Sequence, residues 1–221
     1  GHISRATNSA LEVATGEFVA LVDHDDLLPH DALLHIAEAI AARPTAGYLY
    51  TDEDKIDDHG RHFDPQFKGG WSPEMAITHN YTHHLTVIRR RIVEQAGRLR
   101  PEFNGAQDID LFLRCWELID AADVVHVPFI GYHWRAHAES TATRGDQKGY
   151  LFAAARNGIA EAIARISSRP ASHPSPPRPR ASPSRSSWWT TTPTTTPRSP
   201  CWPRCPIARI CASRCCAIRC R

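Results

Sequence analysis

The residues Phe18-Val19-Ala20-Leu21-Val22 are followed directly by Asp23-His24-Asp25-Asp26. An uninterrupted apolar run of this length is typical of a strand that is buried in a sheet covered on both faces. The acidic residues would then lie at the carboxyl end of that strand. Before it, residues 8–13 carry apolar side chains at helical spacing, and Gly16 suits the C-terminal cap of this helix.

The stretch from residue 29 to residue 54 repeats this alternation. Residues 29–42 have the pattern of an amphipathic helix with Pro29 in its first turn, and residues 47–51 form a second strand that ends in Asp52-Glu53-Asp54. The order helix, strand, helix, strand predicts an α/β fold with a mixed, mainly parallel sheet and helices on both faces. Ligands bind such sheets beyond the carboxyl ends of the strands, where both acidic groups are expected.

Further elements are predicted downstream, and none of them is long enough to cross a membrane. They are a strand over 85–89, a helix over 108–118, strands over 124–127 and 129–134, and a helix over 151–166. The segment 57–81 is rich in Gly, Pro and His and is predicted to be mostly loop. No run of about 18 apolar residues occurs, and the first residues, which do not include Met, lack the features of a secretory signal.

Charge divides the chain at about residue 166. Residues 1–166 hold all 24 acidic residues against 16 Lys and Arg, a net charge of −8, whereas residues 167–221 hold ten Arg and no acidic residue, a net charge of +10. We therefore interpret 1–166 as a folded domain and 167–221, with its 11 prolines, as a tail that is disordered or translated out of frame.

Two other interpretations of the tail stay open. Its arginines suit phosphate groups of nucleic acid or lipid, but Trp188-Trp189 is not interleaved with them as base stacking requires, and no nucleic-acid partner is predicted. Its cysteines are potential zinc ligands, although gaps of three residues without paired histidines do not fit common zinc sites. The single cysteine of the domain, Cys115, fits a reducing cytoplasm. The tail cysteines are Cys201, Cys205, Cys211, Cys215, Cys216 and Cys220.

The carboxylates of Asp23, Asp25 and Asp26 would crowd together at one edge of the sheet. Like charges so close repel one another unless a cation neutralises them. A divalent ion that prefers oxygen ligands, Mg²⁺ or Mn²⁺, is the natural partner, and such ions also hold phosphates. The alternative is a polar turn in which Asp25 or Asp26 caps the next helix.

A second acidic pair lies in Gln107-Asp108-Ile109-Asp110-Leu111. Asp108 falls at the start of a predicted helix, and Asp110, two residues on, points in a different direction. A carboxylate at the place of Asp108 is able to act as a general base toward an acceptor hydroxyl. The alternative is a helix cap that also favours the helix dipole.

The last predicted strand ends in Tyr132-His133-Trp134-Arg135. His133 is a potential metal ligand, Trp134 is able to stack on a sugar, and Arg135 is able to hold a phosphate. The alternative is that they are ordinary surface or core residues. Upstream, the histidines at 79, 83 and 84 do not have the spacing of a helical ligand pair, and we predict no zinc site there.

Taken together, these motifs resemble those of family 2 glycosyltransferases, in one consistent order over most of residues 1–166. The motifs are Ile3-Ser4-Arg5-Ala6-Thr7-Asn8-Ser9-Ala10-Leu11, Gly16 to Asp26, Tyr50-Thr51-Asp52-Glu53-Asp54-Lys55-Ile56-Asp57, Phe67-Lys68, Trp71-Ser72-Pro73, Gln107 to Leu111 and Tyr132 to Arg135. The resemblance implies a GT-A fold and inverting transfer of a sugar from a nucleotide-diphosphate donor, with a divalent metal, Mn²⁺ or Mg²⁺, on the diphosphate.

The resemblance also implies roles for individual residues. Asp23 and Asp25 would form an Asp-x-Asp motif, Asp23 toward the ribose and the metal and Asp25 on the metal, and Asp108 would deprotonate the acceptor hydroxyl. The other expected site residues are Asn8 and Arg135 at the nucleotide, His133 as a metal or diphosphate ligand, and Asp54, Trp71 and Trp134 on the acceptor side.

Two departures from the family pattern affect these expectations. The first strand of the family should precede Gly1, so we expect a truncated domain with an exposed sheet edge beside residues 18–22. Glu74 stands where Asp is usual, and Gln107 where Glu is usual.

The acceptor is expected to be a glycan or lipid-linked glycan of a surface polysaccharide. Work in the cytoplasm is expected, near the inner face of the membrane, although a charge of −8 does not favour anionic lipid.

Two alternatives to the active transferase stay open. One is a binding module that holds nucleotide, metal or glycan without transferring sugar. The other is a metal-dependent phosphohydrolase that uses Asp23, Asp25 and His133 around one ion. The donor base, the sugar and the linkage are not predicted.

Overall fold

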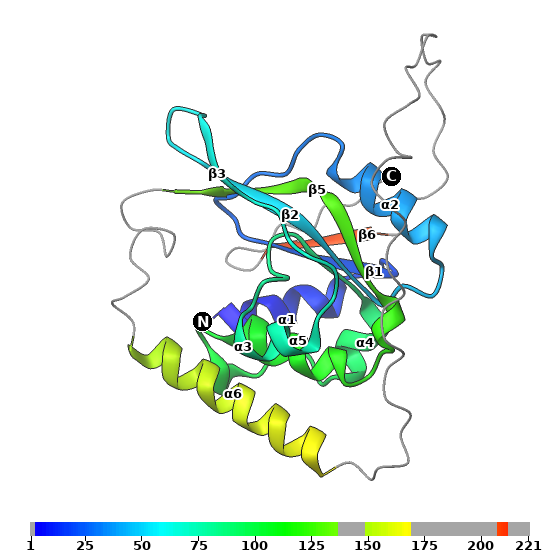
Figure 1. Ribbon diagram of the computed structural model, residues 1–221, viewed down its shortest axis with the longest axis vertical. Coiled ribbons are helices and arrows are strands. Elements are labelled where there is room, and N and C mark those ends of the chain that lie inside the picture. Colours follow the sequence, from blue (N-terminus) through cyan, green and yellow to red (C-terminus); the bar gives the residue numbers. More distant parts are fainter. Residues whose placement is uncertain (1–2, 137–148, 169–206, 212–221) are drawn as a thin grey trace.

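The computed structural model describes residues 3–136, 149–168 and 207–211. These residues form one mixed sheet with helices on both of its faces (Figure 1). None of the helices in 3–136 and 149–168 has the length and apolar character that spanning a bilayer requires.

The sheet has the strand order β5, β2, β4, β1, β6. β4 is antiparallel to both of its neighbours, whereas β5 is parallel to β2 and β6 is parallel to β1. β3 is antiparallel to the carboxyl-terminal half of β2. Among the described strands, all but β3 and β4 therefore run in one direction. The bounds are β1 (Phe18–Val22), β2 (Tyr48–Ile56), β3 (His62–Gln66), β4 (Thr86–Arg89), β5 (Val124–Arg135) and β6 (Ile207–Cys211).

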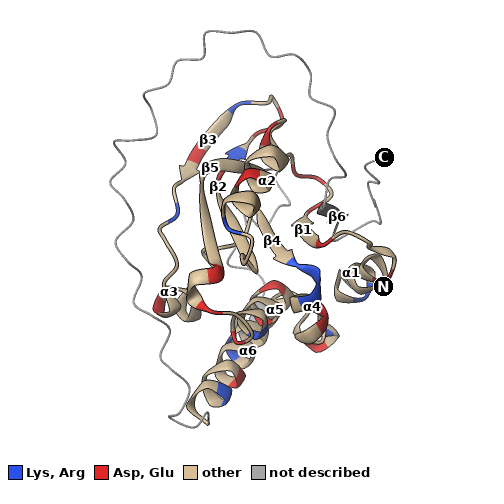
Figure 2. Ribbon diagram, turned by 90° about the vertical axis from the view of Figure 1, so that its right-hand side faces the viewer, with Lys and Arg blue, Asp and Glu red and all other residues tan. Residues whose placement is uncertain are grey.

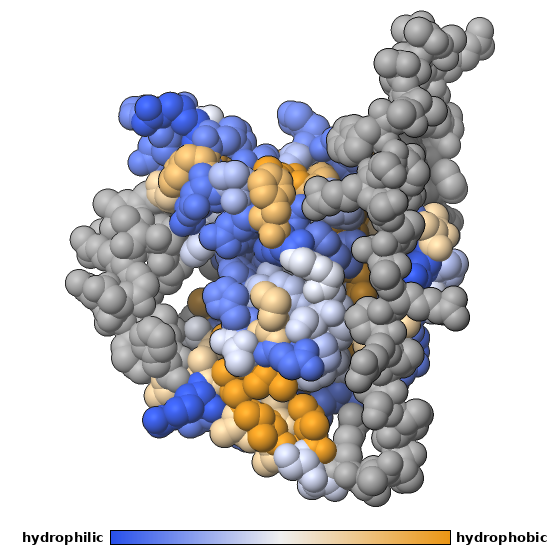
Figure 3. Space-filling model, viewed as in Figure 1, coloured by the Kyte–Doolittle hydropathy of each residue, from blue (hydrophilic) through white to orange (hydrophobic). Residues whose placement is uncertain are grey.

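The helices cover the two faces unequally. In Figure 1, α2 lies on one side of the sheet and α1, α3, α4 and α5 lie on the other, with α6 outside α5. Apolar side chains gather on the lower part of the surface in Figure 3. Two apolar side chains of α6, Ile163 and Ile166, are exposed. The bounds are α1 (Ile3–Val13), α2 (Ala32–Ala42), α3 (Pro73–Thr78), α4 (Arg90–Gln95), α5 (Gln107–Trp116) and α6 (Gly149–Ser167), with 3₁₀ turns at Pro101–Phe103 and Ala121–Asp123.

β1 divides the core into two layers. Phe18, Ala20 and Val22 are buried with Ile36 of α2, and Val19 is buried on the opposite face against the layer of α1, α4 and α5. Because successive side chains of a strand point to opposite faces, a strand between two helical layers must be apolar at every position. This confirms the predicted buried strand and the predicted α/β class.

The prediction that the second strand ends at residue 51 was wrong. β2 continues to Ile56, so Asp52, Glu53 and Asp54 lie inside the strand and are at most 6% exposed. Acidic side chains are stable there because each has an imidazole partner, as described below. The two strands predicted over 124–134 are one strand, β5, which pairs with β2 along its whole length with register shifts near Asp52.

Smaller differences concern the ends of elements and one loop. The first helix begins at Ile3, and the second begins at Ala32 because residues 29–32 form a turn in which Ala32 N–H donates to the Pro29 carbonyl. The segment 57–81, predicted to be mostly loop, contains β3 and α3.

The edge of β1 that we expected to be exposed is paired. Residues 207–211 form β6, which runs parallel to all five residues of β1. An edge strand presents unpaired backbone N–H and C=O groups, and pairing satisfies them. The predictions for residues 169–206 and 212–221 lie outside the described residues.

Gly131 of β5 is required by close packing against β2. A Cβ atom at this position would lie 2.6 Å from Thr51 Oγ1 and 2.8 Å from Thr51 Cβ. We expect Gly131→Ala to lower the free energy of unfolding by about 1–3 kcal/mol, because neither strand has room to move. Urea unfolding measures this loss. Gly69→Ala is the matched control, since a Cβ there meets nothing within 4 Å; an equal loss in both variants would contradict the packing argument.

Candidate functional site

The loop that follows β1 is anchored by the end of β5. The Tyr132 hydroxyl donates to Asp26 Oδ2 at 2.5 Å and accepts from the backbone N–H of Asp23 at 3.1 Å. The backbone N–H of Arg135 donates to Asp26 Oδ1 at 2.7 Å, and its Nε donates to the Asp25 carbonyl at 2.8 Å. Acidic residues (red) lie near β1 in Figure 2. The position of the acidic loop is therefore fixed by a strand more than 100 residues away.

A pocket of about 90 Å³ opens beside this loop. It brings together two of the predicted site residues, Asp23 at the end of β1 and Asp108 in the first turn of α5. Asp108 Oδ2 accepts a hydrogen bond from Asn80 Nδ2 at 2.8 Å. The hydroxyl of Thr7 is buried and has no hydrogen-bond partner among the described residues. The lining residues are Ile3, Thr7, Leu21, Asp23, His83, His84, Thr86, Leu99, Gln107, Asp108 and Tyr132.

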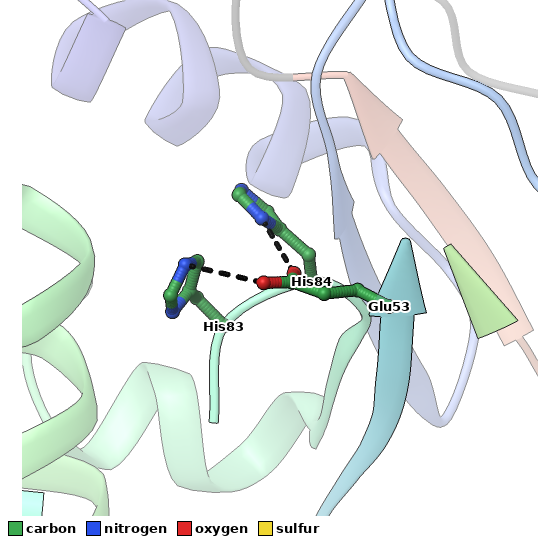
Figure 4. A group of neighbouring side chains, drawn as sticks. All are labelled: Glu53, His83 and His84. Carbon is green, nitrogen blue, oxygen red and sulfur yellow. Dashed lines mark hydrogen bonds and ion pairs between the residues drawn. The ribbon is translucent and has the colours of Figure 1, made fainter. Parts of the chain in front are cut away.

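His84 occupies the wall of this pocket and is held from several sides. Its Nδ1 lies 2.9 Å from Glu53 Oε2, and its ring stacks on Tyr132 with centroids 4.7 Å apart. The Lys68 amino group donates to the backbone carbonyls of His83 and His84 and lies 3.5 Å from Glu53 Oε2. Figure 4 shows both histidines directed toward the Glu53 carboxylate.

The charges of this network are shifted by burial and by contact. Burial lowers the pKa of Lys68 to about 8 and that of His83 to about 3. For Glu53, burial alone would raise the pKa, but the hydrogen bond from His84 and the nearby positive charges outweigh it and the pKa is lowered. Glu53 is therefore ionised at neutral pH, and its hydrogen bond directs the Nδ1 proton of His84 toward it. This contact leaves Nε2 as the ring nitrogen available to another partner.

Asp23, Asp26 and His84 form a group whose potential ligand atoms all lie within 4.8 Å of one another. Burial raises the pKa of Asp26, although the hydrogen bonds from Tyr132 and Arg135 oppose this. Reduced hydration is also the main cause of the raised pKa of Asp23, which His84 lowers and neighbouring aspartates raise.

Several predicted site residues are engaged elsewhere. Asn8 uses its whole amide on the backbone of Leu99, with hydrogen bonds of 2.8 and 3.0 Å. His133 Nδ1 lies 2.5 Å from Asp54 Oδ1 and is outside the group formed by Asp23. Trp71 packs on Tyr81, Phe112 and Trp116.

Other predicted residues do lie near the pocket. The centroids of the Trp134 and His84 rings are 5.1 Å apart. The Lys55 amino group lies 5.7 Å from the centroid of the Trp134 ring. Asp25 and Arg135 lie at the acidic loop. The sequence analysis did not predict that Glu53, Lys68 and His84 contact one another. The available signal was the buried acid in residues 52–54 together with a neighbouring pair of histidines, but they are 31 residues apart and only the fold joins them.

The family model of Glycosyl transferase family 2 matches residues 2–97. The matched segment belongs to this family. Family membership and the sheet described above confirm the GT-A fold class expected from the motifs. The matched residues include the acidic loop, Glu53 and His84 but not Asp108.

Two curated relatives match a longer part of the chain than the family model does. It is 41% identical over 169 residues to the uncharacterized protein y4gI of Sinorhizobium fredii, covering 76% of this chain. It is 36% identical over 165 residues to the O-antigen biosynthesis protein RfbC of Myxococcus xanthus, covering 75% of this chain. The aligned parts span 19% and 13% of the lengths of these relatives.

A solved structure with a related arrangement is the mannosyltransferase PcManGT from Pyrobaculum calidifontis in complex with GDP-Man and Mn²⁺. It is 18% identical to this chain, with a TM-score of 0.43, and the match covers 76% of this chain and 55% of that chain.

Proposed function

We propose that this domain transfers a sugar from a nucleotide-diphosphate donor to a hydroxyl of a glycan, with inversion at the anomeric carbon. The observation that carries the proposal is the pocket that Asp23 and Asp108 share. The two carboxylates line one cavity although they are 85 positions apart in the sequence, which supports a donor-binding role for Asp23 and a role as base for Asp108.

A divalent metal fits the residues at the mouth of this pocket. Asp23, Asp26 and His84 supply two carboxylates and one imidazole, a donor set that suits Mn²⁺ better than purely oxygen-loving ions. Both oxygens of Asp26 accept hydrogen bonds already, and each keeps a second lone pair for a ligand. Asp25 and His133 were the ligands expected from the sequence besides Asp23; we now propose His84 as the imidazole. The metal would neutralise the leaving diphosphate.

Asp108 is proposed as the general base. Its Oδ2 is held by Asn80, which fixes the carboxylate and leaves Oδ1 to take the proton of an acceptor hydroxyl. Inversion requires the base and the leaving diphosphate on opposite sides of the anomeric carbon, and Asp108 and Asp23 line the pocket from two different elements, α5 and the end of β1.

Surface-polysaccharide synthesis is proposed from the relative named for O-antigen biosynthesis. The acceptor would then be a glycan or lipid-linked glycan. Trp134 and the hairpin of β2 and β3 lie beside His84 and are the proposed acceptor side. The exposed face of such an aromatic ring is able to stack on a sugar.

Calorimetric titration with UDP, GDP and dTDP, with and without Mn²⁺, tests this proposal. We expect one nucleotide to bind, and only in the presence of Mn²⁺, with transfer from the matching nucleotide sugar. Asp23→Asn is expected to weaken this binding, because it removes one of the three proposed metal donors. Binding of no nucleotide under either condition would contradict the proposed donor site.

His84→Asn is expected to weaken Mn²⁺-dependent nucleotide binding by about 10- to 100-fold, because it removes one of three metal donors. The same titration measures this change. His79→Asn is the matched control, since His79 lies nearby at the end of α3 and is exposed. Equal affinities of the wild type and His84→Asn would exclude His84 as a ligand and leave the role of Asp108 intact.

A further inference from the structure

A second group of potential metal ligands lies at the place where β2, β3 and β5 meet. It consists of Asp54 on β2, His62 on β3 and His133 on β5. His62 Nδ1 lies 2.9 Å from Asp54 Oδ2, and His133 Nδ1 lies 2.5 Å from Asp54 Oδ1. The two imidazole rings are 4.4 Å apart. None of the three lines the pocket that holds Asp23 and Asp108.

Backbone geometry directs these side chains toward one point. Asp54 pairs with His133 in the register of β2 and β5, and it falls at a register shift between β2 and β3. Such bulges leave one residue unpaired and change the direction of its side chain. Here the bulge allows one carboxylate to reach a histidine on each flanking strand. Because three hydrogen-bonded strands carry the ligands, their positions are fixed before any ion binds.

The charge of the group favours a cation. Asp54 is 6% exposed, and its ion-pair partners among the described residues are the two histidines, whose ring nitrogens are themselves potential metal ligands. Lys55, the nearest cation in the sequence, pairs instead with Asp64 at 2.6 Å. A buried carboxylate without a Lys or Arg partner among the described residues is well placed to bind a cation together with the two imidazoles. The side chain of His62 is 48% exposed, so an ion can enter from solvent.

We propose that Asp54, His62 and His133 bind a transition-metal ion, zinc by preference, and that the ion fastens the β2–β3 hairpin to β5. Two imidazole nitrogens and one carboxylate oxygen are common zinc ligands, and the exposed side of His62 leaves a fourth position for water. The hairpin projects from the sheet in Figure 1, and only one of its strands, β2, pairs with the rest of the sheet in the described residues. A bound ion would add a second attachment.

Zinc content measured on the full-length chain tests this proposal. The protein is stripped with EDTA, kept reduced, loaded with zinc and desalted, and zinc is counted by elemental analysis for the wild type, His62→Asn and His59→Asn. His59 is the matched control because it is an exposed histidine of the same hairpin outside the group. We expect His62→Asn to hold one equivalent fewer than the other two proteins. Equal zinc content in all three would overturn the proposal.

Cobalt spectroscopy separates this site from the cysteines of the chain. The difference between the Co²⁺ spectra of the wild type and His62→Asn should contain ligand-field bands without thiolate charge transfer, because no sulfur ligand is involved. Thiolate bands in the difference spectrum would overturn the assignment. Asp23→Asn, which removes a proposed ligand of the donor site, should keep the equivalent that His62→Asn loses, so failure of the donor site and failure of the zinc site give different results. His62→Gln replaces His62→Asn if circular dichroism shows that the latter is unfolded.

Discussion

Replacement of Asp108 by asparagine is expected to lower the rate of sugar transfer by about 10²- to 10⁴-fold, the usual contribution of a general base. Asparagine keeps the size of the side chain and still accepts the hydrogen bond from Asn80, but it cannot take a proton. Binding of the nucleotide with Mn²⁺ should be retained within a few-fold. Transfer rates at saturating donor, together with calorimetric affinities, separate the two effects.

Asp120→Asn is the matched control for this variant. Asp120 is exposed, precedes a 3₁₀ turn and makes no side-chain hydrogen bond that caps it. Its replacement should leave transfer unchanged. Unchanged transfer in Asp108→Asn would remove the proposed base, whereas loss of both transfer and nucleotide affinity would assign Asp108 to donor binding.

Asp110, two residues further along α5, is expected to show the opposite behaviour, a large loss of stability. It is 1% exposed and accepts hydrogen bonds from Arg100 Nε at 3.1 Å and from Arg114 Nη2 at 2.6 Å. Asp110→Asn removes this carboxylate from both guanidinium groups; Arg100 keeps its ion pair with Glu161 at 2.9 Å, whereas Arg114 keeps only its hydrogen bonds to backbone carbonyls. Breaking a buried ion pair in this way costs about 3–5 kcal/mol, which urea unfolding at pH 7 would measure.

The effect of Asp110→Asn should depend on pH. Burial alone would raise the pKa of Asp110, but the hydrogen bonds from Arg100 and Arg114 outweigh it and hold the pKa below 3.8. A lowered pKa stabilises the folded state above the unfolded value and loses this contribution as the pH falls through the folded value. The difference in unfolding free energy between wild type and variant should therefore shrink below about pH 4.

Glu94→Gln is the matched control for Asp110→Asn. Glu94 pairs with Arg90 at 2.7 Å with the same spacing along a helix, but both side chains are at least one third exposed. Its loss should cost less than about 1 kcal/mol. Equal losses in the two variants, or a difference that does not change with pH, would contradict the role of the buried carboxylate.

The parts of the fold that the sequence predicted are those determined by local patterns. The run from Phe18 to Val22 is apolar at each position because it lies between two helical layers, so its type and bounds were predicted correctly. The end of β2 was not predictable in this way. Asp52 and Asp54 are polar, and they remain in a buried strand only because His126 and His133 of β5 bind them at 2.8 and 2.5 Å.

The residues of the site also differ in how far the sequence predicted them. Asp23 and Asp108 were predicted as site residues from motifs, and both line one pocket. His84 was not found, because its position depends on a backbone with φ of 45° and on contacts with Glu53 and Tyr132 from distant strands. Pairing between segments so far apart leaves no mark in the spacing of a single sequence.

Tyr132 has a consequence for how this domain is able to change over evolutionary time. Its hydroxyl binds Asp26 and the backbone of Asp23, while its ring supports His84. One aromatic side chain therefore holds two elements that have no covalent connection near the pocket. A substitution of Tyr132 removes a contact of both Asp26 and His84, and a substitution of Asp26 or His84 removes a contact of Tyr132. A lineage that alters one of these residues must alter the others with it, or lose the alignment of the pocket.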